Sequence, residues 1–199
     1  MDKSDLATRQ KILDAALTQF AHRGYSGASV QAIVDSAKVT KPTLYYYFAN
    51  KAALFKALVD SAHDERYRLM LVAAEKAETL PTKLVEIMTA LFGFQSGHRE
   101  LMRLAFATCF ASPGELPEKM NYCEKPKRNF EFVHSLIKKE LKAGRLNKRF
   151  GSEELAYGFW GLMNIYVMAH LMMPDCRLNR KTAEGIVELF LKGAASKAK

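Results

Sequence analysis

Apolar residues recur at helical spacing along most of the chain. In residues 5–23, Ile12, Ala16 and Phe20 fall on one face, and Gly24 follows as a stop signal. No segment shows the sustained alternation of apolar and polar positions that marks a half-buried strand. The pattern therefore predicts an all-α protein.

Capping residues and helix breakers divide this pattern into separate helices. Ser29 and Thr40 are suited to begin two short helices, and Asn50 to begin a longer one at Lys51. Pro42 falls in the first turn of the third helix, where a missing N–H is tolerated. After the short helices, we expect helices at about 51–79, 81–95, 99–110, 117–143, 152–173 and 179–193.

The stretch 27–54 has the dimensions of a helix-turn-helix, because two helices of about eight residues flank the turn Lys38-Val39-Thr40. The positions predicted to face inward are apolar: Val30, Ile33, Val34, Val39, Leu44 and Phe48. The opposite face of the second helix presents Lys41, Thr43, Tyr45, Tyr46 and Tyr47. A helix with such a face fits the major groove of B-form DNA.

The residues of this region also carry a family resemblance. The leading helix ends in F-A-x-x-G-Y, and S-V-x-x-I, V-T and T-L-Y-Y-Y-F-x-N-K-x-x-L follow. Over about residues 9–55 the chain resembles the TetR family of one-component transcriptional repressors, with L-Y-x-x-F-x-x-K as the most specific run. Lys38 stands where this family usually has glycine, which predicts a strained left-handed turn, and Tyr47 stands where histidine is common.

The resemblance implies two domains and a DNA-reading surface. Residues 1–51 would form a three-helix, helix-turn-helix DNA-binding domain, and residues 52–199 a helical ligand-binding and dimerisation domain. Lys41 and Thr43 would meet base edges, and Lys51 would contact phosphates. The implied DNA-binding residues are Ser29, Val30, Gln31, Thr40, Lys41, Pro42, Thr43, Tyr45, Tyr46, Tyr47 and Lys51.

The C-terminal region is rich in bulky apolar side chains that could line a cavity for a small, apolar effector. Ordinary core packing is the alternative for each of them. Phe106, Phe110, Trp160 and Asn164 are the expected pocket walls. The spacing of the histidines fits no metal site, and no cofactor is expected.

The resemblance further implies a homodimer formed by the helices near 152–173 and 179–193. Their apolar seams would be Leu155, Phe159, Leu162, Ile186, Leu189 and Phe190. Gly158 and Gly161 would let the helices approach closely. Such a dimer would bind palindromic double-stranded operator DNA and leave it when the effector binds.

Composition bounds these expectations without deciding between them. The 199 residues are 49% hydrophobic and 26% charged, with a formal net charge of +9. The first 51 residues hold seven basic and four acidic side chains, so the positive excess is spread along the chain. Three cysteines are too few for a disulfide framework and favour a reducing compartment.

Targeting and catalytic motifs are the remaining guides. We expect a cytoplasmic protein without membrane contact, because the start of the sequence lacks the apolar segment of a signal peptide and no apolar stretch is suited to span a membrane. No nucleophile elbow, P-loop or HExxH motif indicates an enzyme. The alternative to a DNA-binding regulator is a helical small-molecule-binding protein without DNA-binding activity.

Overall fold

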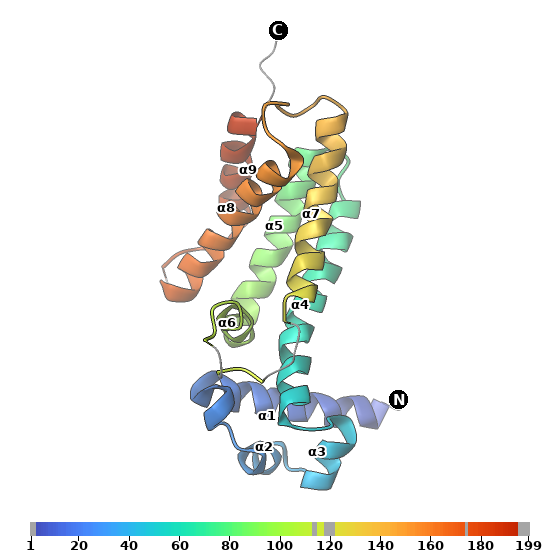
Figure 1. The fold of residues 1–199 in the computed structure, drawn as a ribbon, viewed down its shortest axis with the longest axis vertical. Helices are drawn as coiled ribbons and strands as arrows, with labels where there is room; N and C mark the ends of the chain where they lie inside the picture. Colours follow the sequence, from blue (N-terminus) through green and yellow to red (C-terminus); the bar gives the residue numbers. More distant parts are fainter. Residues whose placement is uncertain (1–2, 113–114, 118–121, 174, 195–199) are drawn as a thin grey trace. The chain divides into compact units, whose positions relative to one another are not determined.

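The computed structural model describes residues 3–112, 115–117, 122–173 and 175–194. Every regular element in these residues is an α-helix, which confirms the predicted fold class (Figure 1). The helices are α1 (Lys3–Gly27), α2 (Val30–Ala37), α3 (Lys41–Tyr47), α4 (Lys51–Glu75), α5 (Leu80–Gly97), α6 (Arg99–Ala107), α7 (Glu124–Lys142), α8 (Ser152–Met172) and α9 (Arg180–Ala194).

The predicted caps begin four of these helices. The Ser29 hydroxyl accepts a hydrogen bond from the backbone N–H two residues ahead, at 3.2 Å. The side-chain oxygens of Thr40, Asn50 and Asn179 accept from the N–H three residues ahead, at 3.3, 2.8 and 2.9 Å. Each cap satisfies an N–H group that has no partner within its helix.

The start of α7 differs from the prediction. A helix was expected from residue 117, but Pro117 and Tyr122 are not helical, and residues 118–121 lie outside the described part. Pro126 supplies the reason: a helix from residue 117 would place its ring deep in the interior, where it clashes with the preceding turn. Beginning at Glu124 instead puts Pro126 in the first turn, where proline is tolerated.

Two other helix ends also moved. Helix α8 begins at Ser152 as expected, with Gly151 as its cap, and the Gly151 N–H donates to the carboxylate of Glu154 at 2.6 Å. The expected helix 51–79 ends at Glu75, since Thr79 takes an extended conformation and caps α5. Helix α6 ends at Ala107, three residues before the predicted end.

The chain divides into two compact units, and each is described separately. The first unit comprises Met1–His63 and Glu100–Glu124, and the second comprises Asp64–Arg99 and Lys125–Lys199. Helix α4 contributes its first half to one unit and its second half to the other. The functional boundary predicted after residue 51 stays a prediction.

One apolar core holds the helices of the first unit together. Phe20 of α1, Ile33 of α2, Leu44 of α3 and Phe55 of α4 are each at most 1% exposed and belong to the same cluster. The positions predicted to face inward all lie in or against this core. The core therefore fixes which face of α3 remains outside.

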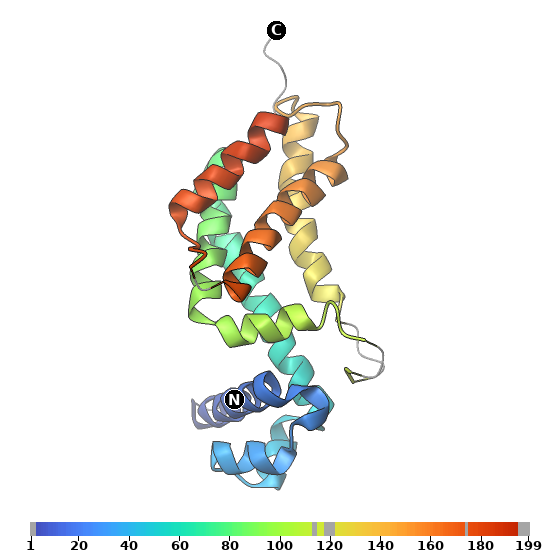
Figure 2. The ribbon, with the colours of Figure 1, turned by 90° about the vertical axis from the view of Figure 1, so that its left-hand side faces the viewer.

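In the second unit, α5, α8 and α9 pack against one another (Figure 2). The rings of Phe159 and Phe190 meet edge to face, with centroids 5.4 Å apart. Helix α7 is joined to α4 through Asp64, whose carboxylate accepts from Arg128 at 3.0 Å and also pairs with Lys125.

The apolar seam expected for a dimer is largely used inside the chain. Four of its six residues, Leu155, Phe159, Ile186 and Phe190, are buried in the chain's own core. Of the other two, Leu189 is 58% exposed and Leu162 is half-buried. Within the described residues, no helix is both long and apolar enough to cross a membrane.

Candidate nucleic-acid interface

The turn between α2 and α3 has a left-handed residue at its centre. Lys38 has φ 55° and ψ 45°, and the N–H groups of Lys38 and Val39 donate to carbonyls of the last turn of α2. Lys38 is the only residue with a positive φ, other than glycines, among the residues described. The left-handed conformation predicted from the sequence is confirmed. It costs free energy at Lys38, because the Cβ atom that glycine lacks is crowded in this conformation.

The outer face of α3 presents only part of the predicted set of side chains, because Thr43 is half-buried and Tyr47 packs against the core. Lys41 and Pro42 are exposed, and the rings of Tyr45 and Tyr46 are 47% and 76% exposed. Burial of Leu44 and Phe48 on the opposite face holds α3 in this orientation. Polar and aromatic groups are thereby displayed on a helix whose rotation is fixed.

Hydrogen bonds arrange the polar groups at the start of α2 and α3. The Thr40 and Thr43 hydroxyls lie 2.8 Å apart, so one donates to the other. The side-chain amide of Gln31 donates to Asp35 at 2.7 Å and lies along α2. Ser29 accepts the capping bond, which leaves its hydroxyl proton for a partner outside the chain.

Tyr47 forms a bond within the first unit. Its hydroxyl donates to the Asp5 carboxylate at 3.0 Å, and its ring meets Tyr46 edge to face. Partial burial, together with the hydrogen bond and charge of Asp5, raises the pKa of Tyr47. The single hydroxyl proton of Tyr47 is used in the hydrogen bond to Asp5. This bond joins the end of α3 to the beginning of α1.

Lys51 is held at the first residue of α4. Its ammonium group donates to the Ser26 carbonyl at 3.3 Å and lies 4.6 Å from the centre of the Tyr25 ring. Partial burial lowers the pKa of Lys51. An ammonium group has three N–H donors, so this contact leaves donors for a phosphate.

The four predicted pocket residues are divided between the units. Phe106 and Phe110 belong to the first, and Phe110 is 75% exposed. Trp160 and Asn164 belong to the second, where the Asn164 amide donates to the Trp160 carbonyl at 2.8 Å. Neither unit by itself brings all four together.

Sequence reasoning missed two groups of supporting residues. Asp5 gave no signal because its partner lies 42 positions away. In the second unit, Arg66, Gln95 and Asn129 are buried polar side chains on three helices. The Gln95 amide has no hydrogen-bond partner in the part of the chain described, which is unusual for a fully buried group and marks a place where a ligand could supply one.

Comparisons with known proteins agree with this geometry. The sequence profile described as "Bacterial regulatory proteins, tetR family" matches residues 12–58, all within the first unit. The chain is 28% identical over 169 residues to the "Probable HTH-type transcriptional regulator YttP" of Bacillus subtilis, covering 83% of this chain and 78% of that protein. It is 40% identical over 53 residues to the "Probable acrEF/envCD operon repressor" of Escherichia coli, 27% of this chain and 24% of that protein.

Solved structures extend the likeness of fold to nearly the whole chain. The transcriptional regulator FadR from Bacillus subtilis, solved in complex with stearoyl-CoA, superposes with a TM-score of 0.74 at 19% identity. The superposition covers 92% of this chain and 98% of that one. The relatives are transcriptional regulators and not enzymes. The profile match identifies residues 12–58 as a TetR-family region, and the regulator homologue and the common fold support a TetR-family transcriptional regulator.

Proposed function

We propose that the protein is a cytoplasmic repressor that binds palindromic operator DNA as a homodimer and is released by a small apolar effector. The observation that carries the proposal is the outer face of α3, where a buried leucine fixes the rotation of a helix that exposes Lys41, Pro42, Tyr45 and Tyr46. A rigid helix with exposed donors and aromatic rings suits the major groove. The similarity to an operon repressor over this region favours repression.

We assign some side chains of this surface to contacts with bases and others to contacts with phosphates. Lys41 and Thr43 reach base edges, and Pro42 supplies an apolar contact to a thymine methyl group. Tyr46 and Lys51 bind phosphates, with Lys51 held in place by its contacts to the end of α1. The remaining members of the surface are Ser29, Val30, Gln31, Thr40 and Tyr45.

Tyr47 has a different role in this proposal. A phosphate accepts hydrogen bonds and donates none, so Tyr47 could contact one through its hydroxyl only by releasing Asp5. We therefore assign Tyr47 to positioning α3.

The outer faces of α8 and α9 provide the proposed dimer contact. Tyr157, Ile165 and Leu189 are 64%, 57% and 58% exposed. At Gly158 and Gly161 a Cβ would meet no atom within 4 Å, so a second helix could approach closely. A two-fold dimer would present two copies of α3 to half-sites about 34 Å apart, or at a related spacing.

The effector would bind in the second unit, where Trp160, Asn164 and the fully buried Gln95 offer an aromatic surface and polar groups. The likeness to a fold that was solved with an acyl-CoA supports an apolar ligand. If the effector binds better to a dimer conformation in which the two copies of α3 do not match the operator half-sites, it would lower the affinity for DNA by about 1–3 kcal/mol.

The test begins with selection of bound sequences from a random duplex pool. Gel-shift titrations then compare Lys41→Ala and Lys51→Ala on the selected duplex and on a scrambled one, at several salt concentrations. We expect Lys41→Ala to cost about 1–3 kcal/mol on the selected duplex and to relax sequence preference. Lys51→Ala should weaken binding to both duplexes alike. It should also reduce the slope of log affinity against log salt concentration by about 1.

Lys142→Ala, a change of an exposed lysine in the second unit, is the matched control. Thermal unfolding of Lys51→Ala checks that loss of the Ser26 contact has not unfolded the first unit. Equal losses for both variants on both duplexes would refute the division of roles. Selection of no preferred sequence would favour a small-molecule-binding protein without DNA-binding activity.

A further inference from the structure

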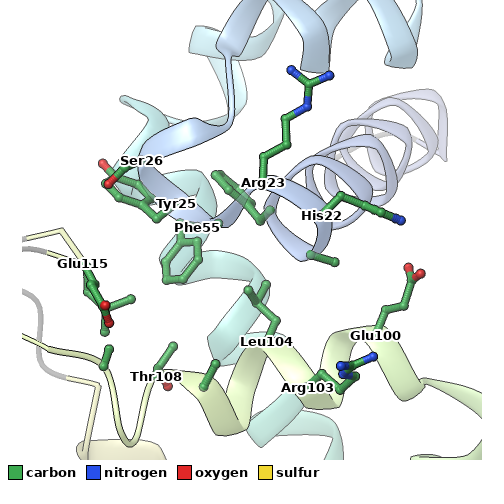
Figure 3. A pocket seen from close by; sticks show the side chains of 16 residues that line it. His22, Arg23, Tyr25, Ser26, Phe55, Glu100, Arg103, Leu104, Thr108 and Glu115 are labelled. Carbon is green, nitrogen blue, oxygen red and sulfur yellow. The ribbon is translucent and has the colours of Figure 1, made fainter.

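A cavity of about 610 Å³ lies within the first unit (Figure 3), whereas the proposed effector site belongs to the second. One wall is the C-terminal part of α1, residues 20–26, with its kink at Gly24, and the other is α6 with residues 111, 115 and 116. Its volume falls in the range of roughly 300–1,000 Å³ that is usual for small-molecule sites. The DNA-reading unit therefore contains a space large enough for a ligand of its own.

Aromatic rings form the apolar part of this cavity. The rings of Phe20 and Phe55 meet edge to face at 5.0 Å, and Tyr25 meets Phe55 in the same manner at 5.3 Å. Leu104 of α6 lines the cavity as well. A flat aromatic ligand would find both stacking and edge contacts here.

Opposite charges stand together on the α6 wall. Glu100 and Arg103 are three residues apart and hence on one face of the helix, yet they form no ion pair with each other or with another described residue. Figure 3 shows both at the same end of the cavity as His22, while Tyr25 and Phe55 lie toward the other.

The other charged groups around the cavity are directed elsewhere. The Glu115 carboxylate accepts from the Ser112 N–H at 2.8 Å. The Arg23 side chain extends away from α6 (Figure 3), and His22 bonds the Thr18 carbonyl through Nδ1 at 2.8 Å. One carboxylate and one guanidinium therefore remain available at the end of the cavity opposite Tyr25 and Phe55.

We propose that this cavity binds a small aromatic zwitterion, such as a free aromatic amino acid. Its ring would rest on the half-buried Tyr25, which packs against Phe55, its ammonium group on Glu100 and its carboxylate on Arg103. Such a ligand matches both charges at once, whereas a ligand with a single charge leaves one of them unpaired.

Occupation of the cavity would act on DNA binding at short range. Tyr25 and Ser26 line the cavity, and the same two residues hold the Lys51 ammonium group. A ring placed against Tyr25 would shift Lys51 and change its reach toward a phosphate. This regulatory step rests on the proposed function, whereas binding of the zwitterion does not.

Three probes with one ring system separate the contributions: L-tryptophan, tryptamine and indole-3-propionate. Each is titrated into the full chain carrying ¹³C-methyl alanine and leucine, with the methyl groups of Ala21, Leu104 and Ala107 as reporters in the cavity wall. We expect saturable shifts at these groups. Tryptophan should bind about tenfold more tightly than either singly charged probe.

Two charge-neutralising variants should respond in opposite ways. Arg103→Gln should weaken the binding of tryptophan and indole-3-propionate and leave the binding of tryptamine unchanged. Glu100→Gln should weaken the binding of tryptophan and tryptamine only. Both residues are exposed, so the fold should tolerate either change. Lys142→Gln in the second unit is the control, and Ala107→Phe should fill the cavity and abolish the shifts.

The proposed site would be overturned by any of three results. These are equal affinity for the three probes, shifts confined to methyl groups of the second unit, and no saturable shift with any probe. Retention of the selected duplex, with and without tryptophan, tests the regulatory step separately. Binding without a change in DNA affinity would refute only that step. Loss of DNA binding in the protein without ligand would instead count against the proposed function.

Discussion

Replacement of Lys38 by glycine should stabilise the protein. A residue with a Cβ costs about 1–2 kcal/mol in the left-handed region, and Lys38 has φ 55° and ψ 45° there. Glycine removes that cost but loses about 0.5–1 kcal/mol more backbone entropy on folding. The net gain should be about 0.5–1 kcal/mol, or a Tm higher by roughly 1–4 °C for a chain of this size.

Urea and thermal unfolding, followed by circular dichroism, measure this gain. Lys38→Ala separates backbone from side chain, since it keeps the Cβ and should stay within about 0.5 kcal/mol of the unaltered protein. Lys138→Gly, at an exposed interior position of α7, should lose about 0.5–1 kcal/mol. If Lys38→Gly were no more stable than Lys38→Ala, the cost assigned to the turn would be wrong.

Two further predictions concern the second unit. Ile165→Asp should weaken self-association at least tenfold in sedimentation velocity, since it buries a charge in the proposed interface, whereas Val72→Asp at an exposed position of α4 should not; equal effects would contradict the assignment. Burial alone would raise the pKa of Asp64, but hydrogen bonds from Lys125 and Arg128 outweigh it and lower that pKa. The ionised carboxylate therefore stabilises the fold above about pH 4, and this contribution is lost as pH falls through the lowered pKa. Urea midpoints between about pH 5 and pH 2 should fall less steeply in Asp64→Asn than in the unaltered protein, and identical slopes would refute the coupling.

Local chemistry made the helix-turn-helix predictable. Ser29 and Thr40 each supply a capping oxygen at a fixed distance along the chain, so the sequence alone locates the start of α2 and α3. The family resemblance added Lys38 as a residue in a glycine position, and the positive φ confirms that reading. Pro126 carried an equally local signal for the start of α7, which the prediction of a helix from residue 117 overlooked.

Contacts between distant segments were not predictable in this way. Helix α8 is apolar on more than one side, so periodicity could not distinguish the face that packs against α9 from the face that stays exposed. Phe159 and Ile165 are both bulky and apolar, yet one is fully buried and the other 57% exposed. Such a distinction depends on how helices rotate against one another, which no single segment encodes.

Through the hydrogen bond between Asp5 and Tyr47, the beginning of α1 helps to hold α3, the proposed DNA-contacting helix, in place. A purification tag that disturbs α1, or a truncation past Asp5, would release the last residue of α3 without touching any base-facing side chain. Binding sites selected with such a preparation would reflect a loosened α3. The duplex selection that tests the proposed function should therefore be done with α1 intact and with any tag placed elsewhere.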